Sequence, residues 1–85
     1  MGGIYPVPAS NELNIQLINE GVAQEAIITI YDLLGKRIFT DATYLDRGVN
    51  QHKLDLTNLG EGNYFLHVQL PSGTLVMEQF TKVSN

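Results

Sequence analysis

The sequence predicts an all-β protein, an antiparallel two-sheet sandwich of six or seven strands. Apolar and polar residues alternate with a period of two in several short runs, which turns one side of each run toward a core. Clusters of Gly, Pro, Asn and Asp interrupt these runs about every 8–12 residues, as they do in sandwiches. No run has a convincing helical period, so a parallel sheet with crossover helices is not expected.

The first two elements are extended. The run Ile4-Tyr5-Pro6-Val7-Pro8 contains two prolines, which exclude a helix and remove backbone donors, so the segment suits a sheet edge. Leu13, Ile15 and Leu17 alternate with polar residues and predict a half-buried strand, which Asn19-Glu20-Gly21 ends.

A hairpin follows. Ala26–Tyr31 is rich in β-branched residues and apolar on both sides, which predicts a central strand. Asp32-Leu33-Leu34-Gly35 predicts its turn, because Asp accepts backbone hydrogen bonds locally and Gly takes positive φ. Residues 36–44 form the returning strand, with Ile38 as the expected core residue.

The second half contains three further strands. Leu54 and Leu56 alternate with polar neighbours in one strand. The run Leu59-Gly60-Glu61-Gly62-Asn63-Tyr64 resembles a tyrosine corner, in which a buried phenol bonds to a backbone group a few residues upstream. An inward row begins at Tyr64 and continues through Leu66, Val68 and Leu70. Residues 74–83 form a last strand with two possible registers, one burying Val76 with Phe80 and the other Leu75 with Met77 and Val83.

Length and charge restrict the function. A chain of 85 residues holds one core, and we expect residues 4–85 to be a single domain and residues 1–3 to be an artificial start. A formal charge of −4 with five scattered basic residues disfavours nucleic acid and anionic membranes as partners. The chain has no cysteine and therefore no disulfide framework.

Patterns for catalysis or metal binding are weak. His52 and His67 lie on different predicted strands and do not predict a zinc site without cysteine or flanking acids. No serine sits in a nucleophile elbow. Asp55 and Glu61 are candidates for a glycosidase-type pair but are better explained as turn and surface residues. We therefore expect no enzymatic activity, no cofactor and no metal.

Three segments, taken in order and spacing, resemble one known family. Tyr5-Pro6-Val7-Pro8 is similar to its Tyr-Pro-Asn-Pro opening, and residues 28–36 to its Ile-Tyr-Asp-x-x-Gly-Lys hairpin. Residues 54–64 are similar to its Leu-Asp-Leu-Ser-x-Leu-x-x-Gly-x-Tyr segment. Together they resemble the C-terminal sorting domain of type IX (Por) secretion cargo, which ends gingipain-like proteases. The motif positions are Tyr5, Pro6, Pro8, Asp32, Gly35, Leu59, Gly62 and Tyr64.

This resemblance implies an immunoglobulin-like sandwich with Greek-key topology and about seven strands, following a cargo domain. It implies transit through the periplasm, recognition by the type IX outer-membrane translocon, and removal by a sortase-like protease. The cargo then stays on the outer-membrane surface or is released outside. The family's closing motif falls on Gly73, Glu78, Phe80 and Lys82, to which the resemblance assigns partner recognition.

Two alternatives remain open at this stage. A fibronectin-III-like adhesion or carbohydrate-binding accessory module is favoured if Phe39, Tyr44 and Phe65 form one flat exposed patch. A homodimer through the terminal edge strand is compatible with the sorting function, because an edge strand leaves backbone groups unpaired.

Overall fold

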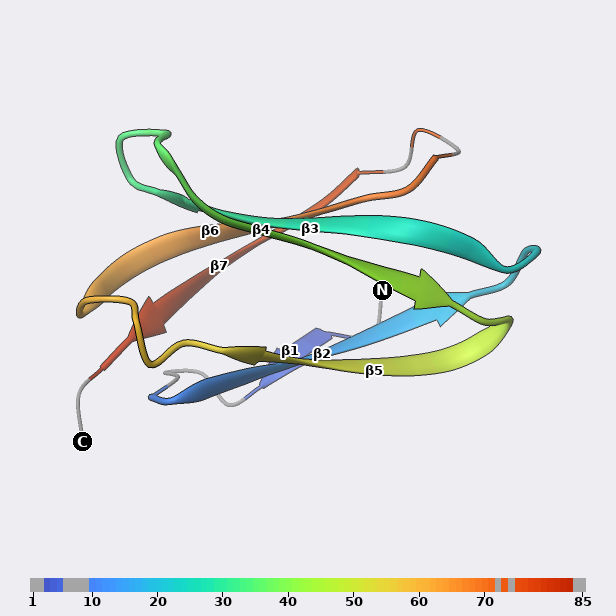
Figure 1. Ribbon diagram of the computed structural model, residues 1–85, viewed down its shortest axis with the longest axis horizontal. Helices are drawn as coiled ribbons and strands as arrows, with labels where there is room; N and C mark the ends of the chain where they lie inside the picture. The colour runs from blue at the N-terminus through green and yellow to red at the C-terminus, as the bar shows by residue number, and fades with distance from the viewer. Residues whose placement is uncertain (1–2, 6–9, 72, 74, 84–85) are drawn as a thin grey trace.

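The computed structural model describes residues 3–5, 10–71, 73 and 75–83, and within them seven strands form two antiparallel sheets (Figure 1). The three-stranded sheet has the order β1-β2-β5, and the four-stranded sheet has the order β4-β3-β6-β7. The strands are β1 (Gly3–Tyr5), β2 (Glu12–Asn19), β3 (Gln24–Asp32), β4 (Arg37–Leu45), β5 (Gly48–Asp55), β6 (Gly62–Gln69) and β7 (Leu75–Lys82).

The chain changes sheets three times, after β2, after β4 and after β5. As a result β2 lies beside β5 and β3 lies beside β6, although neither pair is consecutive in sequence. This is the connectivity of an immunoglobulin-like Greek-key sandwich, and it confirms the predicted fold class. No helix long and apolar enough to cross a membrane occurs among the described residues.

The core fills the space between the two sheets. Alternation along β2 buries Leu13, Ile15 and Leu17, and alternation along β6 buries Tyr64, Leu66 and Val68, so both predicted inward rows are confirmed. The core is completed by Ala26, Ile28, Ile30, Leu45, Leu54, Leu56 and Phe80.

The predicted core residue of the returning strand is wrong. Ile38 is 39% exposed, whereas Phe39 packs against the core and Leu45 is buried. The register between β3 and β4 shifts between Ile30 and Tyr31, so that Ile30 pairs with Phe39 and Tyr31 with Arg37. Pairing of Phe39 with the buried Ile30 puts Phe39 on the core side, so alternation along β4 puts Ile38 on the outer side. The apolar character of Ile38 therefore does not decide its side.

The facing of β7 is settled by its pairing with β6. Phe80 pairs with the buried Tyr64, and Val76 pairs with the buried Val68, so both point toward the core. Leu75 and Met77 point to the opposite side and are exposed. Of the two registers that the sequence allowed, the structure therefore has the one that buries Phe80.

Candidate recognition surface

The residues assigned to partner recognition lie on β7 and on the turn before it. Gly73 is an exposed turn residue with φ of 96°, and its N–H donates to the Leu70 carbonyl at 2.9 Å. Glu78 pairs with the buried Leu66, so its side chain lies on the core side of the sheet. It is nevertheless exposed. This combination is possible because β7 is the edge strand of the four-stranded sheet.

The other two residues of this set are buried. Phe80 is 1% exposed, and its ring stacks on Tyr64 with centroids 5.7 Å apart. Lys82 is 6% exposed and pairs with Gly62, and its ammonium group donates to the Val83 carbonyl at 3.3 Å. Phe80 and Lys82 thus anchor β7, and Gly73 and Glu78 remain accessible to another molecule.

The tyrosine corner holds the start of the neighbouring strand β6. The Tyr64 hydroxyl donates to the Gly60 carbonyl at 2.7 Å, four residues upstream, as the sequence pattern predicts. Leu59 packs against the core beside it. The corner fixes how the chain enters β6, on which β7 is built.

The turn between β3 and β4 also follows its sequence pattern. The Asp32 carboxylate accepts the N–H groups of Leu34 and Lys36, each at 2.9 Å. Gly35 has φ of 83°, a left-handed conformation that favours glycine, and its N–H donates to the Asp32 carbonyl at 3.1 Å.

The opening motif is only partly covered by the described residues. The Tyr5 backbone pairs with Asn14 at the edge of the three-stranded sheet, as expected of an edge segment. Pro6 and Pro8 lie outside the described residues.

Comparison with known proteins places this arrangement in a family. The family model described as the secretion system C-terminal sorting domain matches residues 3–82. The chain belongs to this family. It is a type IX secretion C-terminal sorting signal, and its family is not a catalytic one. Membership implies a cargo on its N-terminal side, contact with the type IX machinery, and export to the cell surface or outside. No curated protein gives a significant match.

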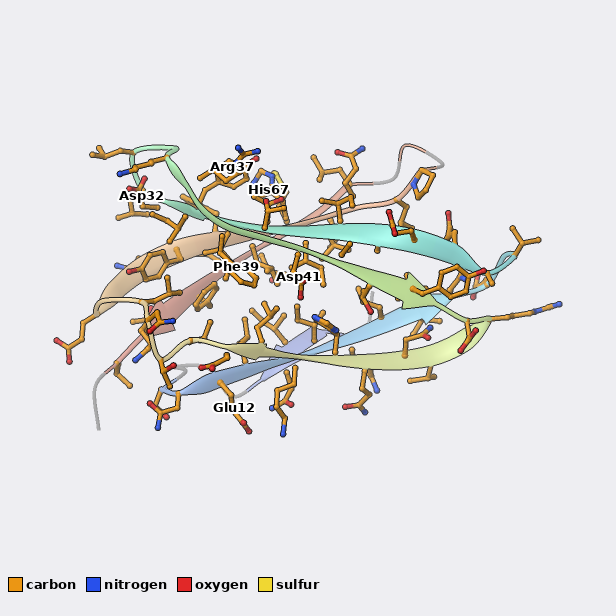
Figure 2. All side chains as sticks on the ribbon, in the orientation of Figure 1. Glu12, Asp32, Arg37, Phe39, Asp41 and His67 are labelled. Carbon is orange, nitrogen blue, oxygen red and sulfur yellow. The ribbon has the colours of Figure 1, made fainter. Side chains whose placement is uncertain are left out.

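The two histidines of the sorting domain do not converge. His52 on β5 lies 3.4 Å from the Asp41 carboxylate on β4 (Nε2 to Oδ2), so this pair bridges the two sheets. His67 instead contacts Tyr31, with ring centroids 4.6 Å apart, on the outer side of the four-stranded sheet (Figure 2). Within the described ranges no three His, Asp or Glu side chains gather as metal ligands would.

Asp55 of the sorting domain is held by hydrogen bonds within its own turn. Asp55 pairs across strands with Glu12, and the two line a groove of about 380 Å³ with Asn11, Lys53 and Thr57. The Asp55 carboxylate accepts the Thr57 N–H at 2.9 Å and the Thr57 hydroxyl at 2.7 Å. The backbone bond and then the side-chain bond lower the pKa of Asp55. The general acid of a glycosidase needs a raised pKa, which is the opposite of the shift at Asp55. Hydrogen bonds to a residue two positions further along the chain are typical of an Asp that forms a turn.

The aromatic side chains do not form the flat patch that would favour sugar binding. Phe39 points into the space between the sheets, as Figure 2 shows, and packs on the core. Tyr44 and Phe65 both point outward, but Tyr44 pairs with Glu25 and Phe65 with Tyr31, at opposite ends of β3. No single sugar ring can stack on both.

Asn19 is a buried organising residue that the sequence pattern marks only as the end of a strand. Its amide nitrogen donates to the carbonyls of Val22 at 2.9 Å, Asp46 at 3.3 Å and Leu45 at 3.4 Å. Its amide oxygen accepts the Gly21 N–H and the Gln24 side-chain amide, each at 3.2 Å. Asn19 thereby ties the β2–β3 turn to the end of β4. The Asn-Glu-Gly sequence signals a turn but not these long-range partners.

Proposed function

We propose that residues 4–85 act as a rigid sorting label whose β7 edge and β6–β7 turn are recognised by the type IX translocon. The observation that carries the proposal is the exposed Glu78 on an edge strand anchored by Phe80 on one side and Val76 on the other. An edge strand offers backbone groups to a partner chain, and a charge on its inner side discourages unspecific strand pairing. Glu78 therefore suits recognition by a partner that brings a basic group.

The proposal includes the steps before and after recognition. The cargo, led by a signal peptide of its parent protein, crosses into the periplasm, and the translocon then engages the sorting domain. A sortase-like protease cleaves between cargo and domain, as in gingipain-like cargo, and the cargo is attached to the outer-membrane surface or released. The role of the domain in these steps is to be recognised, and the chemistry belongs to the protease.

The experiment uses a reporter fused ahead of the sorting domain in a strain with a working type IX system. Glu78→Ala should lower the amount of exported reporter severalfold while the far-UV spectrum and Tm of the purified domain stay unchanged. Glu20→Ala is the matched control, because Glu20 is an equally charged and exposed residue in the β2–β3 turn. Normal export of the Glu78 variant would show that the translocon does not recognise this edge.

Cleavage is tested in the same cells. Reporter recovered at the surface should be shorter than the fusion by the mass of the domain, and the free domain should appear in the medium. Surface reporter that still carries the domain would contradict removal by a sortase-like protease and leave the sorting role intact.

A further inference from the structure

The outer face of the four-stranded sheet carries few charges and several exposed apolar side chains. Pairing places alternate residues of each strand on this face, in rows that run across the sheet. Large apolar members are exposed, among them Met77 at 60% and Leu75 at 46%. Of the described residues in these rows, only Glu25 and Arg37 are charged. The rows are Glu25 and Tyr44; Ile27, Ala42, Gln69 and Leu75; Thr29, Thr40, His67 and Met77; Tyr31, Arg37, Phe65 and Gln79; and Asn63 and Thr81.

The outer face of the three-stranded sheet has the opposite character. β2 and β5 present mostly polar and charged residues there, and apolar side chains occur at one end only, at Ile18 and Val49. The polar members are Glu12, Asn14, Gln16, Gln51, Lys53 and Asp55. Figure 2 shows Glu12 on this side of the molecule, and Arg37 and His67 on the other. The outer sides of β2 and β5 therefore lack the composition of an interface, and the outer face of the four-stranded sheet has it.

The two charges on the apolar face are arranged symmetrically. Glu25 pairs with Tyr44 near one end of the β3–β4 ladder, and Arg37 pairs with Tyr31 near the other end. The two rows are about 20 Å apart at the rise of a β-strand. Their midpoint lies between the rows of Ile27 and Thr29. One acid and one base cancel, so this face contributes nothing to the net charge of −4 that would keep two copies apart.

We propose that a second copy of the chain docks on this face, related to the first by a two-fold axis that runs across the strands at that midpoint. Such an axis reverses each strand and so brings the Glu25 end of one copy onto the Arg37 end of the other. The interface would contain two identical Glu25–Arg37 pairs. This self-association goes beyond the sorting function and does not depend on it.

The same axis brings the two middle rows together, and each of them has a large exposed apolar residue on β7. The row of Ile27 and Leu75 faces the row of Thr29 and Met77 of the second copy, so that Leu75 meets Met77 along β7. Tyr44, which is 65% exposed, faces the Arg37 end of the second copy, where its ring suits a guanidinium group. Opposite charges at both ends and apolar side chains between them favour a copy of this chain over an unrelated apolar surface.

The size of the face predicts a weak, reversible dimer. Four strands about 4.8 Å apart and about 23 Å long give roughly 450 Å² of projected surface per copy. Stable interfaces bury about 800 Å² of accessible surface on each partner, so a face with this projected area lies at the low end of interface sizes. We therefore expect dimers at domain concentrations on the order of 0.1–1 mM and monomers well below that range.

Charge reversal tests the proposal by sedimentation equilibrium of the purified domain. Glu25→Arg sets two arginines against each other at both ends of the interface, and Arg37→Glu sets two acids against each other. Each variant alone should therefore dimerise about tenfold more weakly or worse. Mixing the two variants should form a heterodimer in which one end pairs the natural Arg37 with the natural Glu25 and the other end pairs the two substituted residues.

The outcome of mixing follows from the symmetry of the interface. Glu25 of the Arg37→Glu variant would face the unchanged Arg37 of the other variant, and the two substituted positions would face each other as base against acid. The heterodimer should therefore form with close to wild-type affinity. Recovery on mixing cannot come from a change in fold stability.

Two further variants locate the surface. Met77→Lys should abolish dimers, and Val49→Lys, a matched change at an exposed apolar residue of the other sheet, should leave them unchanged. Equal dimerisation of the Met77 variant and the wild-type domain, as in a dimer through the β7 backbone edge, would overturn the proposal. So would a wild-type domain that is monomeric at about 1 mM, or charge variants that fail to recover when mixed.

Discussion

Tyr64 shows how one side chain can hold two parts of the fold. Its ring packs on Phe80 from β7, and its hydroxyl donates to the Gly60 carbonyl at 2.7 Å. Tyr64→Phe keeps the ring and removes only the hydrogen bond, so it should cost about 0.5–1.5 kcal/mol in the free energy of unfolding. Urea denaturation measures this cost. Tyr44→Phe, at an exposed outward position, is the control, and an equal effect of both changes would contradict the role of the corner.

Asp55 makes stability depend on acid pH. Hydrogen bonds from Thr57 lower the pKa of the Asp55 carboxyl in the folded state, so its ionised form stabilises the fold. This contribution is complete above the unfolded pKa of about 3.9 and is lost as the pH falls through the lower folded pKa. Asp55→Asn should therefore be less stable than wild type at neutral pH, and the difference should shrink below a pH of about 4. A difference in Tm that stays constant across this range would contradict the assignment.

On β3, the same substitution should cost very different amounts of unfolding free energy on the two sides of the strand. Ile30 is 1% exposed in the core, and Ile27 on the same strand is 38% exposed on the outer face. Ile30→Ala should cost about 2–5 kcal/mol because it leaves a cavity. Ile27→Ala should cost no more than about 1 kcal/mol as a surface change. Similar losses in chemical denaturation would contradict the register of the sheet.

The β3–β4 turn depends on one glycine. Gly35 has φ of 83°, so Gly35→Ala should destabilise the domain by about 1–2 kcal/mol through backbone strain, although a Cβ there would meet no neighbour. Gly60→Ala is the matched control, because its Cβ would also lie in open space and no positive φ opposes it. Thermal unfolding of the two variants should separate them by several degrees, roughly 4–8 °C per kcal/mol. Equal melting temperatures would show that the turn tolerates a side chain.

An element can be predicted from the sequence when the residues that determine it lie close together in the chain. The hairpin turn at Asp32 and the corner at Tyr64 are closed by hydrogen bonds between residues four positions apart, and both were predicted correctly. Ile38 was wrongly assigned to the core, because the apolar neighbours Ile38 and Phe39 lie on opposite sides of β4 and only the pairing of Phe39 with Ile30 shows which of them faces the core. The side of β7 that faces the core could not be predicted from its own sequence, because apolar residues occur on both sides of the strand. Pairing with β6 decides it.

For the whole molecule, sequence motifs identify the family but do not show which residues of the closing motif a partner can touch. The structure separates them, with Phe80 and Lys82 inside and Gly73 and Glu78 outside. The buried Asn19 amide reaches a carbonyl 26 residues further along the chain, so no local pattern predicts its network. Sheet pairing also brings the apolar residues of four strands onto one outer face, which no single strand reveals.

As a whole, this sandwich is an export address for an attached cargo. The most direct test compares surface exposure of one reporter, with and without the domain at its C-terminus, in a strain with the type IX translocon and in an isogenic strain without it. We expect protease-accessible reporter outside the cell only when both domain and translocon are present. Reporter that stays inside in every case, or that reaches the surface without the translocon, would contradict a sorting role.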